Sequence, residues 1–172
     1  NIKVTNITNG MVSADEVENK LTDPISGSNI GNGWTTDMPT IVKIDTTSKG
    51  AYNNPANSVK VTSSNSSNIH LYSPTTRIEP NSTYVVRAYS NVKSKNGGEL
   101  GVYIDEYDAS GNWISGQYKQ TISTWYINEV SFTYLASSYN VTTARLQFIV
   151  TKSSGTIVYL DNIQWIEKEQ IK

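Results

Sequence analysis

Over most of its length the chain alternates short runs of apolar and polar residues with clusters of turn-forming residues, and this rhythm sets the fold class. Residues 59–62 and 69–72 alternate apolar and polar side chains, as half-buried strands do. Residues 108–112 are typical of a tight turn. The predicted strands are residues 59–62, 69–72, 84–89, 100–107, 125–135, 144–151 and 156–166. Regularly spaced short strands predict an all-β domain, an antiparallel β-sandwich or jelly roll.

The length and the net charge of the chain limit the architectures and the binding partners that we expect. A chain of 172 residues can bury a proper core, so we expect a single domain over 1–172 with a solvated tail at about 167–172. Residues 1–57 are less regular, and 15–21 are expected to form two helical turns at most. The net charge of −1 gives no reason to expect nucleic acid or an anionic membrane as partner. We expect a monomer.

The composition favours a secreted bacterial protein. The chain has no cysteine, is rich in Asn, Ser, Thr and Tyr, and begins with Asn1 rather than Met. Without cysteine it has neither disulfides nor thiolate chemistry. We therefore expect an extracellular domain, either a mature chain or one excised from a larger secreted enzyme.

The aromatic residues are biased toward rings that carry a polar atom, with eleven Tyr and four Trp against two Phe. Such rings are favoured where one face is apolar and the tip meets water or a polar ligand. Sugars are ligands of this kind, because their C–H faces stack on rings while their hydroxyls form hydrogen bonds. The bias suggests a sugar-binding surface, and a Tyr-rich extracellular β-protein without one is the alternative.

Strand parity divides the predicted strands into a core face and a second face that is polar and aromatic. Within 100–107, Val102 and Ile104 oppose the set Tyr103, Asp105 and Tyr107. In the other two long strands the second face carries Arg87, Tyr89, Arg145 and Gln147. We expect the apolar set between the sheets and the ligand on the second face.

Several short motifs occur in an order that resembles the carbohydrate-binding modules of families 4, 9, 16 and 22, a β-sandwich group attached to bacterial polysaccharide-degrading enzymes. They are Asn9-Gly10, Gly33-Trp34, residues 57–61, 79–84, 107–112 and 124–126, and the sharpest match, Val158-Tyr159-Leu160-Asp161-Asn162-Ile163. One departure is that Met11-Val12-Ser13 replaces the group's acidic opening run. The resemblance spans most of the chain and implies a galactose-binding-domain-like jelly roll without catalytic activity.

The resemblance also implies binding of plant polysaccharide chains (β-glucan, xylan or mannan) in a groove on the concave sheet, which targets an attached glycoside hydrolase. With parity it predicts the carbohydrate-binding residues Trp34, Tyr72, Arg87, Tyr89, Tyr103, Asp105, Tyr107, Trp113 and Gln147. Trp34 matches the group's Gly-Trp position, and Trp113, in the turn after Asn112, is placed at the rim with Tyr72. Each ring has an alternative as a core or ordinary surface ring, and we assign Trp125 and Trp165 to that structural role.

A structural Ca²⁺ is a further implication, since the group commonly joins its N-terminal segment to its last strand through this ion. Asp161 matches the motif's calcium-binding aspartate, and Glu16 or Glu18, or Asp15 beside them, would supply a second carboxylate. Calcium prefers several hard oxygen ligands, and an Asp inside an apolar run needs a partner. The alternative is that Asp161 pairs only with turn amides or a neighbouring lysine.

Two other classes of function are open. One is a small jelly-roll glycosidase or polysaccharide lyase. A glycosidase needs two facing carboxylates, and parity allows Asp105 with Glu129 but not with the adjacent Glu106. The single histidine, His70, excludes a multi-histidine zinc site and is expected at the surface or against a glycan. The third hypothesis is a structural or protein-binding module of a surface protein, with Tyr103 and Tyr107 in a domain interface and no glycan bound.

Overall fold

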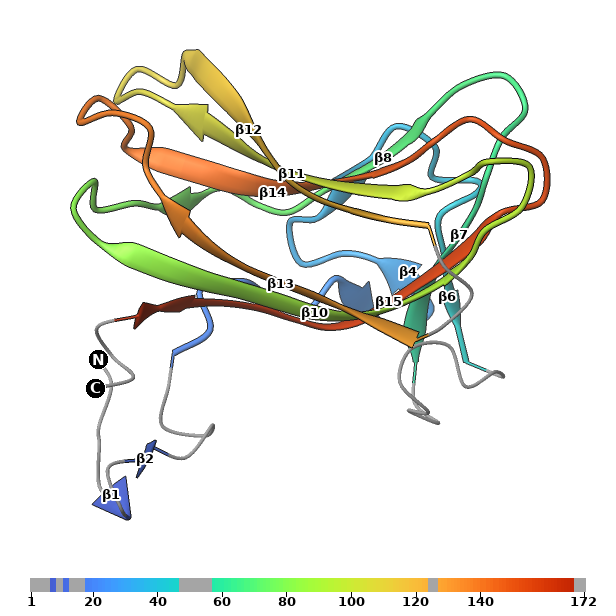
Figure 1. Ribbon diagram of the computed structural model, residues 1–172, viewed down its shortest axis with the longest axis horizontal. Helices are drawn as coiled ribbons and strands as arrows, with labels where there is room; N and C mark the ends of the chain where they lie inside the picture. The colour runs from blue at the N-terminus through green and yellow to red at the C-terminus, as the bar shows by residue number, and fades with distance from the viewer. Residues whose placement is uncertain (1–6, 9–10, 13–17, 47–56, 124–126, 169–172) are drawn as a thin grey trace.

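The computed structural model describes residues 7–8, 11–12, 18–46, 57–123 and 127–168, and within these ranges the chain consists of antiparallel β-strands and no α-helix. The strands form two sheets that face each other, seen as an upper and a lower layer in Figure 1. No helix in the described part of the chain is long and apolar enough to cross a membrane. The predicted all-β antiparallel sandwich is confirmed.

The lower layer, called the β10 sheet, has the strand order β13-β10-β15-β7-β6, and the upper layer, the β11 sheet, has the order β12-β11-β14-β8-β5, with β9 paired to β14. The β10 sheet comprises β13 (Ile127–Leu135), β10 (Thr83–Lys93), β15 (Ile157–Glu167), β7 (Ser58–Thr62) and β6 (Lys43–Asp45). The β11 sheet comprises β12 (Trp113–Ile122), β11 (Leu100–Tyr107), β14 (Thr143–Val150), β8 (Ile69–Tyr72), β5 (Thr35–Thr36) and β9 (Thr76–Arg77). Two short pairs complete the set: β1 (Ile7–Thr8) with β2 (Met11–Val12), and β3 (Ile25–Ser26) with β4 (Asn29–Ile30).

The core lies between the two sheets and follows the predicted alternation. On β14 every second residue is buried, from Ala144 to Val150, while the residues between them face outward. Trp165 is fully buried and packs edge-on against Tyr84 and Tyr134, with ring centroids 6.1 Å and 5.5 Å away. Its predicted structural role is confirmed, whereas Trp125 lies outside the described residues.

The strand predictions succeed where alternation is strong and fail where both faces are polar. The bounds of β8 and β11 are those predicted, and β10 extends beyond its predicted end to Lys93. The longest missed element is β12, where sequence reasoning placed Trp113 in a turn, and the short strands β1 to β6 and β9 were not predicted either. Strand β12 lies at the edge of its sheet and buries only Ile122 fully, so its sequence lacks the apolar repeat that marks inner strands.

Two predictions concern the ends of the chain. Residues 18–21 are not helical, and residues 15–17 lie outside the described part. The strand β15 continues to Glu167, whose Oε1 accepts a hydrogen bond of 2.7 Å from Ser82 Oγ, so this residue belongs to the sheet rather than to the predicted tail.

A buried carboxylate connects the two sheets. Glu106 on β11 has no exposed surface, and its Oε2 accepts hydrogen bonds from Tyr134 OH on β13 (2.6 Å) and the Ser137 amide (2.9 Å). Ser115 and Gln117 also donate to this carboxylate. Burial raises the pKa of Glu106, but the hydrogen bonds from Ser115, Tyr134 and Ser137 together outweigh burial and hold the pKa below its ordinary value. The parity prediction that Glu106 faces away from Asp105 is confirmed.

Candidate functional site

The outer surface of the β11 sheet gathers most of the predicted sugar-binding residues, and we call it the aromatic face. Its members are His70, Tyr72, Tyr103, Asp105, Tyr107, Trp113, Gly116, Tyr118, Arg145 and Gln147. The register places Tyr103 between Tyr118 and Gln147, because β11 lies between β12 and β14. In the next row Asp105 lies between Gly116 and Arg145. The structure therefore brings four strands together on one surface.

Asp105 is the polar centre of the aromatic face. Its side-chain Oδ2 accepts hydrogen bonds from Arg145 Nε at 3.0 Å and from Gln147 Nε2 at 2.9 Å. The residue is only 6% exposed, and its charge is balanced by the Arg145 guanidinium. Within the described part of the chain no residue donates to the other oxygen, Oδ1. That oxygen is an acceptor held in a fixed position.

The rings of Tyr72 and Tyr107 both contact the Arg145 guanidinium. The Arg145 guanidinium carbon lies 3.9 Å from the centroid of the Tyr72 ring and 5.7 Å from that of Tyr107. On Tyr72 the His70 ring stacks as well, with centroids 5.8 Å apart and planes 6° apart. Burial raises the pKa of both tyrosines, and Arg145 opposes that effect. Tyr72 thus lies on the aromatic face, where Arg145 packs on its ring and His70 stacks with it, and its contact with a sugar stays a prediction.

His70 itself is fixed by a carboxylate at the edge of the aromatic face. Its Nδ1 lies 2.6 Å from Asp37 Oδ2, and its backbone amide donates to Asp37 Oδ1 at 2.9 Å. The imidazole is therefore a surface group beside Tyr72, as the sequence predicts.

Two rings on β12 are open to solvent, Trp113 with 63% of its surface exposed and Tyr118 with 58%. Tyr118 also contacts Tyr103 edge-on, with centroids 5.6 Å apart. Between them is Gly116, where an added Cβ would lie 3.4 Å from Asp105 Oδ1 and 3.7 Å from Trp113 Cζ2. Gly116 therefore places no side chain over the Asp105 oxygen, on a face with two exposed rings.

Sequence reasoning missed Tyr118, Gly116 and the central part played by Arg145. The first two were missed because β12 was not predicted. Gly116 and Tyr118 are two residues apart, and this spacing is the sequence signal that would place both on one face of a strand. Trp113 lies on the same face because the register is irregular near Tyr107.

Trp34 does not belong to the aromatic face. Its ring is 4% exposed and packs in the core, and its Nε1 donates a hydrogen bond of 2.9 Å to the Thr22 carbonyl. The indole N–H is thereby satisfied inside the fold, and no ring face remains for a ligand. The predicted stacking role of Trp34 is wrong, and its core alternative holds.

Arg87 and Tyr89 were assigned to the wrong surface. Parity correctly turns both side chains outward from β10, but β10 belongs to the other sheet. Their outer face is opposite to the one that carries Tyr103. Glu129 pairs with Tyr89 on that same outer surface, so it cannot face Asp105 across a groove. The carboxylate pair considered for a glycosidase is therefore separated by the whole sandwich.

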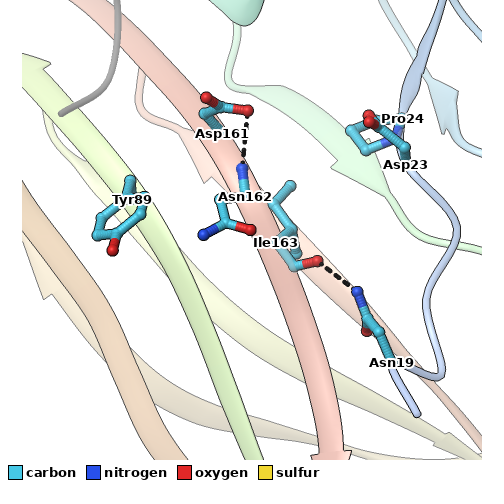
Figure 2. A pocket seen from close by; sticks show the side chains of 7 residues that line it. All are labelled: Asn19, Asp23, Pro24, Tyr89, Asp161, Asn162 and Ile163. Carbon is cyan, nitrogen blue, oxygen red and sulfur yellow. Dashed lines mark hydrogen bonds between the residues drawn. The ribbon is translucent and has the colours of Figure 1, made fainter. Parts of the chain in front are cut away.

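A polar hollow lies over β15, on the outer side of the β10 sheet (Figure 2). It has a volume of about 500 Å³ and is lined by Asn19, Asp23, Pro24, Tyr89, Asp161, Asn162 and Ile163. The register of β15 against β10 shifts between Arg87 and Tyr89, and Asn162 has a φ of 49°. This bulge turns Asp161 and Asn162 toward the hollow.

Of the predicted calcium ligands that the structure describes, only Asp161 lines this hollow. Asp161 lines it, and Asp23 lines it from the opposite side as drawn in Figure 2. Glu18 is exposed and does not line it, while Glu16 lies outside the described residues. Two carboxylates and an amide oxygen are the hard donors that Ca²⁺ prefers, and no group of three acidic or histidine side chains occurs in the described ranges. The donor types fit calcium, and Asp23 is a donor that the sequence did not suggest.

Solved carbohydrate-binding modules share this fold. The CBM22-1 xylan-binding domain from Paenibacillus barcinonensis Xyn10C matches with a TM-score of 0.53 and 16% identity, over 87% of this chain and 97% of that one. TmCBM61 in complex with β-1,4-galactotriose matches with a TM-score of 0.55 and 12% identity, over 86% and 99%. The enzymatically active domain of tailspike protein 4 of bacteriophage CBA120 matches at 0.59 and 14% identity, but this chain spans only 21% of it.

The sequence itself identifies the family. A comparison with curated protein sequences finds no match. The sequence model of the carbohydrate binding domain family, CBM_4_9, matches residues 26–155. This range is most of the chain and contains every residue of the aromatic face, in agreement with the family that the motifs predicted. The chain belongs to the carbohydrate-binding domain family CBM_4_9.

Proposed function

We propose that the chain is a non-catalytic module that binds a neutral polysaccharide chain across the aromatic face, with Trp113 and Tyr118 stacking on the sugar and Asp105 accepting a hydroxyl. The observation that carries the proposal is that Asp105 Oδ1 lies beside Gly116, which places no side chain over it, on a face with two rings of more than half exposed surface. Rings of this kind bind the C–H face of a sugar, while fixed acceptors select its hydroxyls.

The spacing along β12 favours an oligosaccharide over a single sugar. Trp113 and Tyr118 lie opposite Tyr107 and Tyr103, which are four residues apart on β11, and this corresponds to about 13 Å in an extended strand. This span is longer than one pyranose ring. The polysaccharide chain would then cross the strands' side chains from the pair Tyr107–Trp113 to the pair Tyr103–Tyr118.

The polar groups at the centre are preorganised. Gln147 and Arg145 are held by Asp105, so they lose little freedom when a ligand arrives. The predicted residues that keep their place in the proposal are Tyr103, Asp105, Tyr107, Trp113 and Gln147. Xylan is one ligand to test first, because a xylan-binding module shares the fold. β-Glucan and mannan remain the other predicted ligands.

The setting of the module is part of the proposal. It would act as a secreted domain that holds an attached glycoside hydrolase near its substrate, raising the effective concentration of that substrate by tethering. We also propose that Ca²⁺ binds at the hollow beside Asp161 and Asp23 and stabilises the fold without taking part in sugar binding.

The test is native affinity electrophoresis in gels that contain xylan, mixed-linkage β-glucan, mannan or galactan, with reducing-sugar release measured on the same samples. Retardation without release is expected. Release of reducing sugar would make the domain an enzyme, and the absence of both across the panel would refute carbohydrate binding by this chain.

Variants locate the site. Trp113→Ala and Tyr118→Ala should each weaken binding about tenfold, since each loses roughly 1–1.5 kcal/mol of stacking and ring burial. Gly116→Ala should weaken it as well, because its methyl group covers Asp105 Oδ1 without a clash. The matched control is Arg87→Ala, an exposed residue on the opposite sheet. Loss of binding in Arg87→Ala with retention in Trp113→Ala would contradict the assignment.

A further inference from the structure

The end of the sandwich next to the aromatic face carries a second hollow that the proposed function does not use. It lies between the turn 108–112, which joins β11 to β12, and the loop 136–142, which joins β13 to β14. These loops are the neighbouring yellow and orange loops at the upper left of Figure 1. The hollow, called the end pocket, has a volume of about 420 Å³ and is lined by Asp108, Ala109, Ser110, Ile114, Tyr139, Asn140 and Thr142.

The turn that forms one wall of the end pocket is fixed by its own hydrogen bonds. Asp108 Oδ1 accepts from the amides of Ser110 and Asn112, each at 2.9 Å. The Asp108 amide donates to the Asn112 carbonyl at 2.9 Å, which closes the turn. Gly111 has a φ of 81°, a conformation that glycine adopts without strain. The wall therefore needs no ordering when a ligand binds.

The loop that forms the other wall is anchored in the core. Val141 is fully buried, and the amide of Thr142 donates to the Tyr107 carbonyl at 2.9 Å. Between these anchors and β13, Tyr139 points outward with 81% of its surface exposed, which is the largest exposed fraction among the large apolar and aromatic side chains of the described residues. A firmly held loop thus presents a bare ring beside a hollow.

The chemistry of the end pocket suits a neutral sugar. Tyr139 offers a ring face, and Ile114, which packs against the core, offers an apolar floor. In the described part of the chain the Asn140 amide group and the Ser110 hydroxyl make no hydrogen bond through their side chains, so both can pair with a ligand hydroxyl. These groups match the ring-plus-hydroxyl character of a sugar, and the volume lies in the range of small-molecule sites.

The charge of the end pocket argues against an anionic glycan. No Lys, Arg or His lines it, and Asp108 does. The hydrogen bond from the Asn112 backbone, opposed by desolvation and helped by further hydrogen bonds from the same turn, holds the pKa of Asp108 below its ordinary value, so this carboxylate is ionised at neutral pH. A uronic acid or a sulfated sugar would meet an uncompensated negative charge, whereas a neutral hydroxyl can donate to it.

We propose that the end pocket is a second binding site, for one or two residues of a neutral glycan, separate from the aromatic face. The two surfaces adjoin where Ile114 follows Trp113, but one is a sheet surface and the other is the end of the sandwich. Two sites on one module would bind a branched or folded polysaccharide more tightly than either does alone. The proposal shares with the proposed function only the class of ligand.

The experiment is a titration of the ¹⁵N-labelled chain, followed by amide chemical shifts, with xylohexaose, cellohexaose, mannohexaose and β-1,4-galactotriose up to millimolar concentration. We expect shifts of the Ser110, Tyr139 and Asn140 amides that persist in the Trp113→Ala variant. Shifts confined to the β12 amides would refute the second site while leaving the proposed function intact. Shifts at the end pocket alone would refute the aromatic face instead. If no sugar of the panel moves the Tyr139 and Asn140 amides, the end pocket is not a glycan site.

Variants separate binding from loop stability. Tyr139→Ala should weaken binding at the end pocket about fivefold or more, and Tyr139→Phe should retain most of it, since stacking needs only the ring. Neither should change the shifts on β12. The matched control is Leu135→Ala, which removes an exposed apolar side chain outside the pocket lining. Equal weakening by Leu135→Ala and Tyr139→Ala would overturn the proposal, as would shifts with galacturonic acid as large as those with the neutral sugars.

Discussion

Replacing Glu106 with alanine tests how the two sheets are held together. The carboxylate is fully buried on β11, and its Oε2 accepts from Tyr134 OH at 2.6 Å and from the Ser137 amide at 2.9 Å. Both donors lie beyond the β11 sheet, on β13 and just after it. In Glu106→Ala both lose their acceptor, while the partly exposed Ser115 and Gln117 can turn to water.

The expected loss of stability follows from these contacts. The Tyr134 hydroxyl is a buried donor, and its loss of a partner costs about 1–3 kcal/mol, whereas the amide of the exposed Ser137 can turn to water. Glu106→Gln should cost only about 1–2 kcal/mol, because its oxygen still accepts from Tyr134 and Ser137 while its amide donates to Ser115 Oγ. Urea unfolding followed by tryptophan fluorescence measures both, and the slope of the free energy against urea concentration should not change.

A double-mutant cycle supplies the control. Tyr134→Phe removes one donor and keeps the ring, so the loss in Glu106→Ala should be smaller when Tyr134 is already Phe, with a coupling of about 1 kcal/mol or more. A loss below about 1 kcal/mol in Glu106→Ala, or no coupling with Tyr134→Phe, would refute the view that this carboxylate joins the sheets.

The pH dependence of stability has a definite sign. The pKa of Glu106 is lowered in the folded state, so its contribution is present above the unfolded value, about 4.3, and is lost as the pH falls through the folded value. The stability difference between the wild type and Glu106→Gln should therefore shrink below about pH 4. A difference that grows on acidification would contradict the direction of the pKa shift.

Three further predictions concern other parts of the chain. Gly98→Ala should lower the free energy of unfolding by about 2 kcal/mol, because its Cβ would lie 2.0 Å from Thr156 Oγ1, and an unchanged urea midpoint would contradict this packing. EDTA should lower the melting temperature of the calcium-loaded chain by several degrees but not that of Asp161→Asn, and calorimetry that finds no such difference would rule out the calcium proposal. Tyr72→Phe should leave sugar binding nearly unchanged, because it keeps the ring that packs against Arg145, and a tenfold loss in affinity electrophoresis would assign a ligand contact to the Tyr72 hydroxyl.

The sequence predicts which residues turn outward far better than which outward residues meet. Parity places Arg87, Tyr89, Tyr103 and Asp105 outward from their strands, and all four do turn outward. A sandwich, however, has two outer surfaces, and the period of two along a strand says nothing about which sheet the strand joins. Arg87 and Tyr89 were therefore grouped with residues on the opposite side of the molecule.

The same limit applies to single rings. The bias toward Tyr and Trp indicates a sugar-binding chain, yet it does not distinguish the buried Trp34 from the exposed Trp113. Trp34 is buried because the Thr22 carbonyl reaches its indole N–H, a contact between residues twelve positions apart on irregular chain. Only the packing of residues 18–46 against the sheets settles that role.

The sequence by itself determined the all-β class, the strands with strong alternation, the core set and the family, because these depend on local periodicity and on motif order. The tertiary structure alone decided the composition of the aromatic face, since strand order brings Gly116 and Tyr118 beside Asp105 and Arg145. It also decided that Glu129 is far from Asp105 and that Asp23 joins Asp161 at one hollow. Proximity between distant strands follows from sheet order and register, and neither is encoded in the period of a single strand.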